Sequence, residues 1–206
     1  PNDHDVRRAL SDLWRTEDSE QARQYLEPLL SIEEPLPRDL RRRARIELVE
    51  GDLEAAARSF ELSGIPQRAG PLSDALYVFM QTDRWEQAGQ WCEALIRQHG
   101  HAMSQTELGS LYTDLGTVRL GMGQPVAASA SFERAISLGD ERGETLEGLG
   151  RALLDVPHRR HDALKVIERA LPKVTSERRI ELLLLRTESI EDAWQVADLL
   201  EAYRFE

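Results

Sequence analysis

Apolar residues recur at spacings of three and four along almost the whole chain, which is the pattern of one face of an α-helix. Short polar or glycine-containing turns interrupt the pattern, and they begin at Thr16, Glu50, Gln81, Gly121 and Asp155. The sequence contains no Asn-Gly or Asp-Gly hairpin turn and no convincing alternation of apolar and polar residues. The pattern therefore predicts an all-α protein built from helical hairpins.

The predicted hairpins repeat with a period of about 34 residues, most evidently in the second half of the chain. Residues of the first helix recur 34 positions later, and residues of the second helix recur 35 positions later. The matched pairs are Tyr112 and Leu146, Leu115 and Leu149, Gly116 and Gly150, Ala128 and Ala163, Phe132 and Ile167, and Ala135 and Ala170. One hairpin of this size cannot bury its apolar face alone, so we expect the repeats to stack.

These positions resemble the motif of the tetratricopeptide repeat (TPR) family. The matching residues are Tyr112, Leu115, Gly116, Gly123, Ala128, Phe132 and Ala135. The resemblance implies a right-handed α-solenoid of about six antiparallel helix-turn-helix repeats, in which Phe132 fills the gap between hairpins and first helices line a concave groove. The implied repeats cover residues 3–36, 37–68, 69–108, 109–142, 143–173 and 174–203, so that residues 1–206 form a single solenoid.

The end of the chain is apolar. Leucine surrounds most of the helix predicted over residues 180–185, and apolar residues continue in the segment 199–206. Solenoids normally end in polar caps, so we expect this chain to be a fragment of a longer array. A short domain that dimerises end to end is the alternative.

Composition and charge narrow the classes of partner. The net charge of -11 disfavours nucleic-acid binding, which needs a broad basic surface. No apolar run approaches the roughly 20 residues of a membrane helix, so direct membrane insertion is not expected. Cys92 is the only cysteine in the sequence, which excludes an internal disulfide and a zinc site of several cysteines.

No motif in the sequence predicts catalysis. The Gly-x-Gly at Gly121 and Gly123 follows no strand and lacks the Lys-Ser/Thr of a phosphate loop, so it is interpreted as a turn. Cys92 is expected to be a small buried side chain. The paired histidines are expected to be solvated turn residues: His99, His101, His158 and His161. We therefore predict a protein that is not an enzyme, without catalytic, cofactor-binding or metal-binding residues.

Four arginines share one face of a predicted helix. Arg38, Arg41, Arg42 and Arg45 follow the spacing i, i+3, i+4, i+7. The TPR resemblance implies that Arg38, Arg41 and Arg45 point into the groove. The complete set of candidate partner-binding residues is Arg7, Arg15, Arg38, Arg41, Arg45 and Tyr77. Such a surface suits a protein partner with an acidic surface.

A second interpretation of the same arginines stays open. They form a solvated helix face if nearby acids neutralise them. The candidate acids are Glu33, Glu34, Asp39 and Glu47. The sequence alone does not decide between a ligand surface and a neutralised face.

The functional hypotheses follow from the repeats. The first is a non-catalytic protein-interaction scaffold. The irregular, arginine-rich array resembles the TPR section of bacterial exopolysaccharide exporters of the Pel and cellulose types. That resemblance implies docking of a polysaccharide-modifying enzyme, or guiding of the polymer, in the periplasm before an outer-membrane barrel. A cytoplasmic adaptor, or the regulatory half of an enzyme or sensor, is the alternative. The third hypothesis is polysaccharide contact in the groove through Trp14, Tyr77 or Tyr112.

Overall fold

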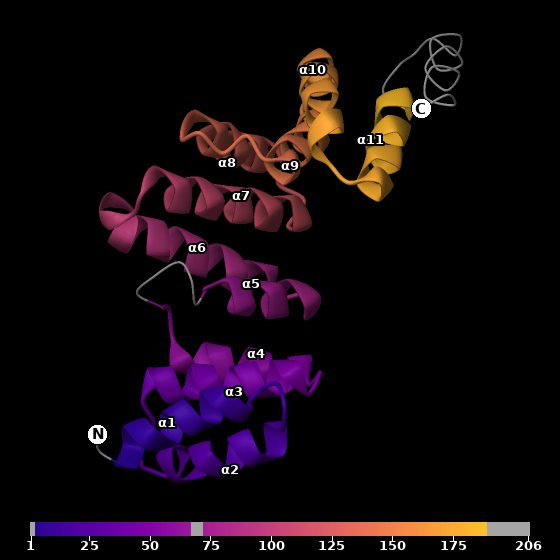
Figure 1. Ribbon diagram of the computed structural model, residues 1–206. Helices are drawn as coiled ribbons and strands as arrows, with labels where there is room; N and C mark the ends of the chain where they lie inside the picture. The colour runs from indigo at the N-terminus through magenta and orange to yellow at the C-terminus, as the bar shows by residue number, and fades with distance from the viewer. Residues whose placement is uncertain (1–2, 67–71, 189–206) are drawn as a thin grey trace. The chain divides into compact units, whose positions relative to one another are not determined.

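The computed structural model describes residues 3–66 and 72–188 (Figure 1). About 80% is helical, and no strand occurs in these two ranges. The all-α prediction is therefore confirmed. The second half of the expected repeat 174–203 and the apolar segment 199–206 lie outside the described residues.

The chain divides into two compact units, Pro1–Ala102 and Met103–Glu206. Unit 1 contains α1 (Asp3–Trp14), α2 (Ser19–Leu30), α3 (Pro37–Val49), α4 (Leu53–Ser63), α5 (Leu72–Gln81), α6 (Trp85–His99) and the short 3₁₀ helix η1 (Gly100–Ala102). Unit 2 contains α7 (Gln105–Gly121), α8 (Pro125–Ser137), α9 (Gly143–Leu154), α10 (Arg160–Ala170), the short 3₁₀ helix η2 (Leu171–Lys173) and α11 (Ser176–Glu188).

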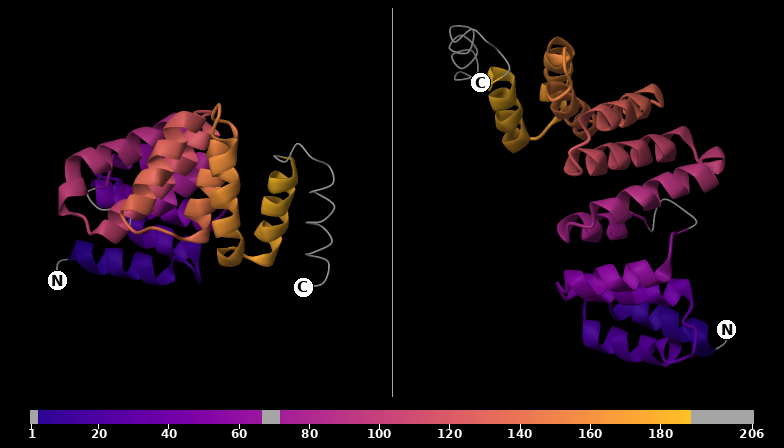
Figure 2. Two further views of the ribbon diagram at one scale, coloured as in Figure 1. Left: turned by 90° about the horizontal axis from the view of Figure 1, so that it is seen from above. Right: turned by 180° about the vertical axis from the view of Figure 1, so that it is seen from behind.

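Consecutive helices pack as hairpins: α1 with α2, α3 with α4, α5 with α6, α7 with α8, and α9 with α10. In unit 2, α11 packs beside α10 (Figure 2). Helix α7 begins at Gln105, four residues before the repeat expected over 109–142. The earlier start has a local cause, because Ser104 and Glu107 form a reciprocal capping box there.

Turn chemistry at the helix ends matches the hairpin pattern. The side chains of Asp18 and Asp52 accept the backbone N–H groups of the first turns of α2 and α4. Gly123 lies in the turn between α7 and α8 with a φ of +68°, a conformation that glycine adopts without strain. The structure therefore places Gly121 and Gly123 at a helix end and a turn.

The core of unit 2 is built around Phe132 on α8, which is fully buried. Two glycines admit its ring, and a Cβ atom would lie 2.8 Å from the ring at Gly116 on α7 and 2.4 Å at Gly148 on α9. One repeat later, a Cβ at Gly150 would lie 2.7 Å from Ile167. Phe132 therefore fills the space between two hairpins, as the sequence predicts, because neighbouring first helices lack side chains there.

Unit 1 has its own apolar contacts. Ala22, Leu26 and Leu29 of α2 pack with Ile46 of α3, and Trp14 packs against this cluster. The ring of Phe79 on α5 meets that of Trp91 on α6 edge to face, with centroids 5.0 Å apart. These contacts hold helices in place without using the arginines of α3.

Candidate protein-interaction surface

Ion pairs join the first helices of consecutive hairpins in unit 1. Arg8 on α1 holds Asp39 on α3 through two hydrogen bonds, of 2.7 and 2.9 Å, and both residues are buried. Asp12 on α1 accepts from Arg42 on α3 at 3.1 Å. The partners are 31 and 30 residues apart, so α1 and α3 run parallel with a nearly constant offset.

The ion pair between Arg8 and Asp39 was not predicted from the sequence, where Asp39 was expected only to neutralise the arginines of its own helix. Its hydrogen bond with Asp39 raises the pKa of Arg8, although burial acts against this. A bidentate arginine–carboxylate pair has fixed geometry and fixes the register of the two helices. The spacing of 31 residues, close to the repeat length, was the signal that could have revealed it.

The pairs decide which arginines of α3 are neutralised. Arg42 pairs with Asp12, and Arg45 donates to Asp74 on α5 at 2.7 Å. Glu47 instead accepts from Arg43 at 2.8 Å and from Ser59 at 2.6 Å. The neutralised-face interpretation therefore fits Arg42 and Arg45, although their main partners are acids of neighbouring hairpins.

Arg38 and Arg41 remain without a carboxylate partner among the described residues. The Arg38 side chain is exposed. Arg41 Nη1 reaches only the carbonyl oxygens of Ser63 and Gly64, at 3.4 and 3.5 Å. Burial, and secondly the neighbouring charge of Arg45, lower the pKa of Arg41. This lowering is the expected response of a cation that lacks a carboxylate nearby.

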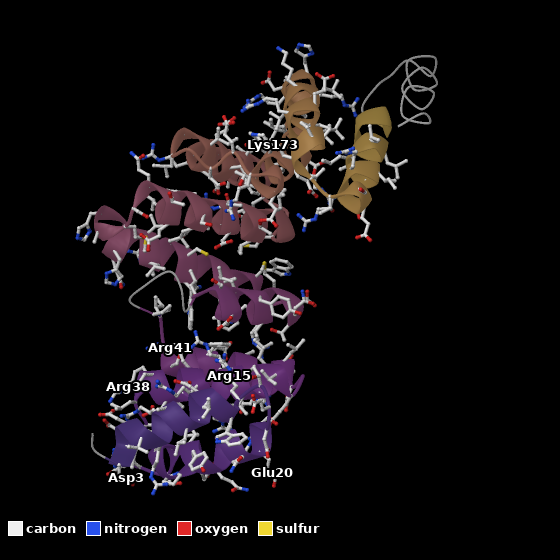
Figure 3. All side chains as sticks on the ribbon, viewed as in Figure 1. Asp3, Arg15, Glu20, Arg38, Arg41 and Lys173 are labelled. Carbon is white, nitrogen blue, oxygen red and sulfur yellow. The ribbon has the colours of Figure 1, made fainter. Side chains whose placement is uncertain are left out.

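Arg15 lies in the turn directly after α1, three residues beyond Asp12, the acid that pairs with Arg42. Arg15 has no ion pair or hydrogen bond in the described part of the chain, and it is labelled with Arg38 and Arg41 in Figure 3. We call Arg15, Arg38, Arg41 and Arg45 the arginine face; it carries four positive charges, and Asp74 neutralises one of them.

The two other candidate residues differ in their surroundings. Arg7 pairs with Asp3 of its own helix at 2.8 Å and is therefore not part of the unpaired set. Tyr77 lies on α5, one turn after Asp74, and half of its surface is exposed. Tyr77 therefore offers an exposed aromatic ring one helical turn from Asp74, the acid that pairs with Arg45.

Unit 2 carries a different polar cluster, which the sequence analysis did not single out. Thr113 on α7 donates to Asp140 at 2.9 Å and lies 3.0 Å from the hydroxyl of Thr145 on α9. Burial opposes the ionisation of Asp140, but hydrogen bonds from Arg142 and Thr113 outweigh it and lower its pKa to about 2. This cluster ties α7 to α9 through neutral and charged hydrogen bonds.

The described residues form no cluster of metal ligands. Within these residues, no group of three or more histidine, cysteine, aspartate or glutamate side chains could hold a metal ion. Cys92 is buried, as expected. No helix in the same ranges is long and apolar enough to cross a membrane.

Comparisons with known proteins give the fold. No family model and no curated protein matches the sequence. The chain is similar to the solved structure of PilF from Pseudomonas aeruginosa, with 18% identity, a TM-score of 0.67, and coverage of 98% of this chain and 91% of that one. It is also similar to PilW, described as a widely conserved type IV pilus biogenesis factor, with 15% identity, a TM-score of 0.70, and coverage of 97% and 91%.

A third similar structure is MamA from Desulfovibrio magneticus RS-1, with 18% identity, a TM-score of 0.63, and coverage of 88% of this chain and 96% of that one. These neighbours are TPR-like proteins. At such low identity they inform on the fold and not on partners. The chain therefore has the fold of the TPR-like helical solenoids.

Proposed function

We propose that this chain is a non-catalytic protein-interaction scaffold and that the arginine face binds an acidic surface of a protein partner. The observation that carries the proposal is that Arg15, Arg38 and Arg41 have no carboxylate partner among the described residues, whereas most other arginines in these residues are ion-paired. Arginines without acids stay available for charge-assisted hydrogen bonds to another molecule. Exposed Tyr77 adds an aromatic contact of the kind enriched in interfaces.

The ion pairs between hairpins support a scaffold because they fix the spacing of the free arginines. Arg8 with Asp39, and Asp12 with Arg42, set α1 against α3, and Arg45 with Asp74 ties α3 to α5. A surface held in one geometry loses less conformational entropy on binding than a mobile one. The TPR-like fold shared with PilF, PilW and MamA supports the general role of a protein-interaction scaffold.

The finer role that we propose is docking of a polysaccharide-modifying enzyme during bacterial exopolysaccharide secretion, in the periplasm. Its support is the resemblance of the arginine-rich repeats to the TPR sections of such exporters. The alternative is that this chain is a cytoplasmic adaptor that binds another protein, or the regulatory half of an enzyme or sensor that binds its own catalytic half. A direct carbohydrate contact has one supporting observation, the exposed ring of Tyr77, since Trp14 packs against the core.

A capture experiment with matched variants tests the proposal. A photo-crosslinking residue replaces Ser73, which is exposed on α5, and captured proteins from envelope and cytoplasmic extracts are identified by mass spectrometry. The Arg15→Glu/Arg38→Glu variant removes two unpaired cations. The control is Arg58→Glu/Arg134→Glu, which changes the net charge equally at exposed positions outside the arginine face. Circular dichroism first shows that all three proteins are equally helical.

We expect an acidic partner that the parent and the control capture and that the Arg15→Glu/Arg38→Glu variant loses. An enzyme acting on polysaccharide among the captured proteins would support the finer role, and a cytoplasmic protein would favour the adaptor. Equal capture by both variants would exclude the arginine face as the binding surface. Absence of specific capture by any of the three proteins would contradict the scaffold function.

A further inference from the structure

A cavity of about 670 Å³ lies in unit 2, between the start of α9 and the turn that leads into α11. None of its described lining residues belongs to the arginine face. The lining residues are Arg142, Gly143, Glu144, Lys173, Val174, Thr175 and Arg178. Three of them are cations, and they come from three different elements: the residue before α9, η2 and α11 (Lys173 is labelled in Figure 3).

These cations have hydrogen-bond donors to spare. Arg178 Nη1 lies 3.7 Å from Glu144 and 3.6 Å from Glu147, which is too far for hydrogen bonds. Arg142 uses Nε and Nη2 for Asp140 and Ser110, and no acceptor within the described residues takes up its Nη1. Lys173 Nζ donates to the backbone oxygen and the carboxylate of Glu141, which leaves one of its three N–H groups.

Two helices begin at this cavity. The first intrahelical bond of α9 runs to the carbonyl of Arg142, and that of α11 runs to the carbonyl of Thr175. Arg142 makes no side-chain cap for α9. The backbone N–H groups of each first turn therefore have no acceptor in their own helix, and the positive ends of two helix dipoles meet near the cations.

Gly143 allows this arrangement. A Cβ atom at this position would lie 2.4 Å from the backbone oxygen of Lys173, so only glycine lets the start of α9 approach η2 so closely. The close approach brings Arg142 and Lys173 to the same cavity. The positive charge around the cavity therefore depends on the close backbone packing of α9 against η2 as well as on the charged side chains.

Glu144 is the only acid among the lining residues that the structure describes, and its side chain is 62% exposed. A neighbouring cavity of about 420 Å³ shares Arg142 but is also lined by Asp140 and Glu141, whose carboxylates repel an anion. An anion is therefore attracted more strongly to the larger cavity than to the smaller one.

We propose that the cavity between α9 and α11 binds the phosphate group of a small phosphorylated ligand. A tetrahedral phosphate dianion accepts hydrogen bonds from several directions, and cations from three elements together with two helix starts supply donors from several directions. A planar carboxylate is satisfied by two donors and fits this arrangement less well. The cavity volume falls in the range of small-molecule sites, about 300–1,000 Å³, and leaves room for more than a bare phosphate ion. This site does not depend on the proposed scaffold function.

Isothermal titration calorimetry of the full chain at low salt tests the site, with glycerol 3-phosphate, inorganic phosphate and glycerol as probes. The Arg178→Gln variant removes the cation with the most unused donors. The Glu144→Gln variant removes the one acid of the lining and should therefore act in the opposite direction. Arg134→Gln, at an exposed position of α8 outside the cavity, is the control. Lys173→Gln is a second cation variant, and circular dichroism checks the helicity of all of them.

We expect saturable binding of glycerol 3-phosphate, no binding of glycerol, and affinity about 10-fold weaker in Arg178→Gln and in Lys173→Gln. Glu144→Gln should bind a few-fold more tightly, and Arg134→Gln should match the parent. Inorganic phosphate binding as tightly as the ester would support the anion site and identify the free ion as the ligand. No saturation by about 10 mM, or equal affinity in the parent and both cation variants, would overturn the proposal.

Discussion

Asp114 on α7 carries a charge that the fold disfavours. Burial raises the pKa of its carboxyl to about 6, and the charges of Glu144 and Asp140 add to this effect, while Arg142 opposes it. Asp114 makes no hydrogen bond or ion pair with any residue that the structure describes. The Asp114→Asn substitution keeps the shape of the side chain and removes its charge, so it measures the free-energy cost of holding that charge in unit 2.

The sign and size of the effect follow from the two pKa values. In the unfolded chain the pKa of the carboxyl is its ordinary value of 3.8, and in the folded chain it is about 6. The folded state thus binds the proton more tightly, and stability falls as the pH rises through this window. The difference corresponds to about 3 kcal/mol at most, since one pKa unit is about 1.4 kcal/mol. Part of the side chain stays in contact with water, so we expect about 1–2 kcal/mol.

Urea unfolding followed by circular dichroism measures the free energy of unfolding at pH 7.5 and pH 4.5. Asp114→Asn should be more stable than the parent by about 1–2 kcal/mol at pH 7.5 and by less than half of that at pH 4.5. Hydrogen exchange of peptides from α7 and α9 should show the gain in unit 2. The control is Asp155→Asn, an exposed residue whose change should stay within about 0.5 kcal/mol. An Asp114→Asn variant with unchanged or lower stability at pH 7.5 would refute this reasoning.

Three further outcomes are expected from the packing. Arg8→Met leaves the buried carboxylate of Asp39 with only its longer ion pair to Arg42, at 3.5 Å, and should cost about 3 kcal/mol in urea unfolding. Adding Asp39→Leu should recover most of this loss, and no recovery would contradict a simple charge effect. Gly148→Ala should cost about 1–3 kcal/mol, seen as a lower Tm, because its Cβ would overlap the ring of Phe132; an unchanged Tm would show that the ring can move aside. Ser104→Ala removes the capping box of α7 and should cost about 1 kcal/mol, with faster hydrogen exchange in the first turn only; loss of protection along all of α7 would show that the cap supports the whole helix.

The sequence predicted the helices and their hairpin arrangement because both follow from local physical chemistry. Helical spacing of apolar residues marks the packed faces, and aspartate, serine and glycine mark the ends. The resemblance to the TPR motif also implied that Phe132 would lie between hairpins. The second glycine in contact with its ring, Gly148, was not predicted because its role depends on the neighbouring hairpin.

The charged surface could be predicted only in part. The spacing of Arg38, Arg41 and Arg45 shows that they share a helix face, but ion pairing depends on acids about one repeat away. Only the tertiary register of α1, α3 and α5 decides that Arg42 meets Asp12, that Arg45 meets Asp74, and that Arg38 meets no acid among the described residues. The cavity between α9 and α11 likewise exists only where two helix starts converge. The sequence by itself determined which segments are helical and that they repeat, whereas the tertiary structure decided which charges are neutralised, because Coulomb interactions depend on distances between residues that are far apart in the chain.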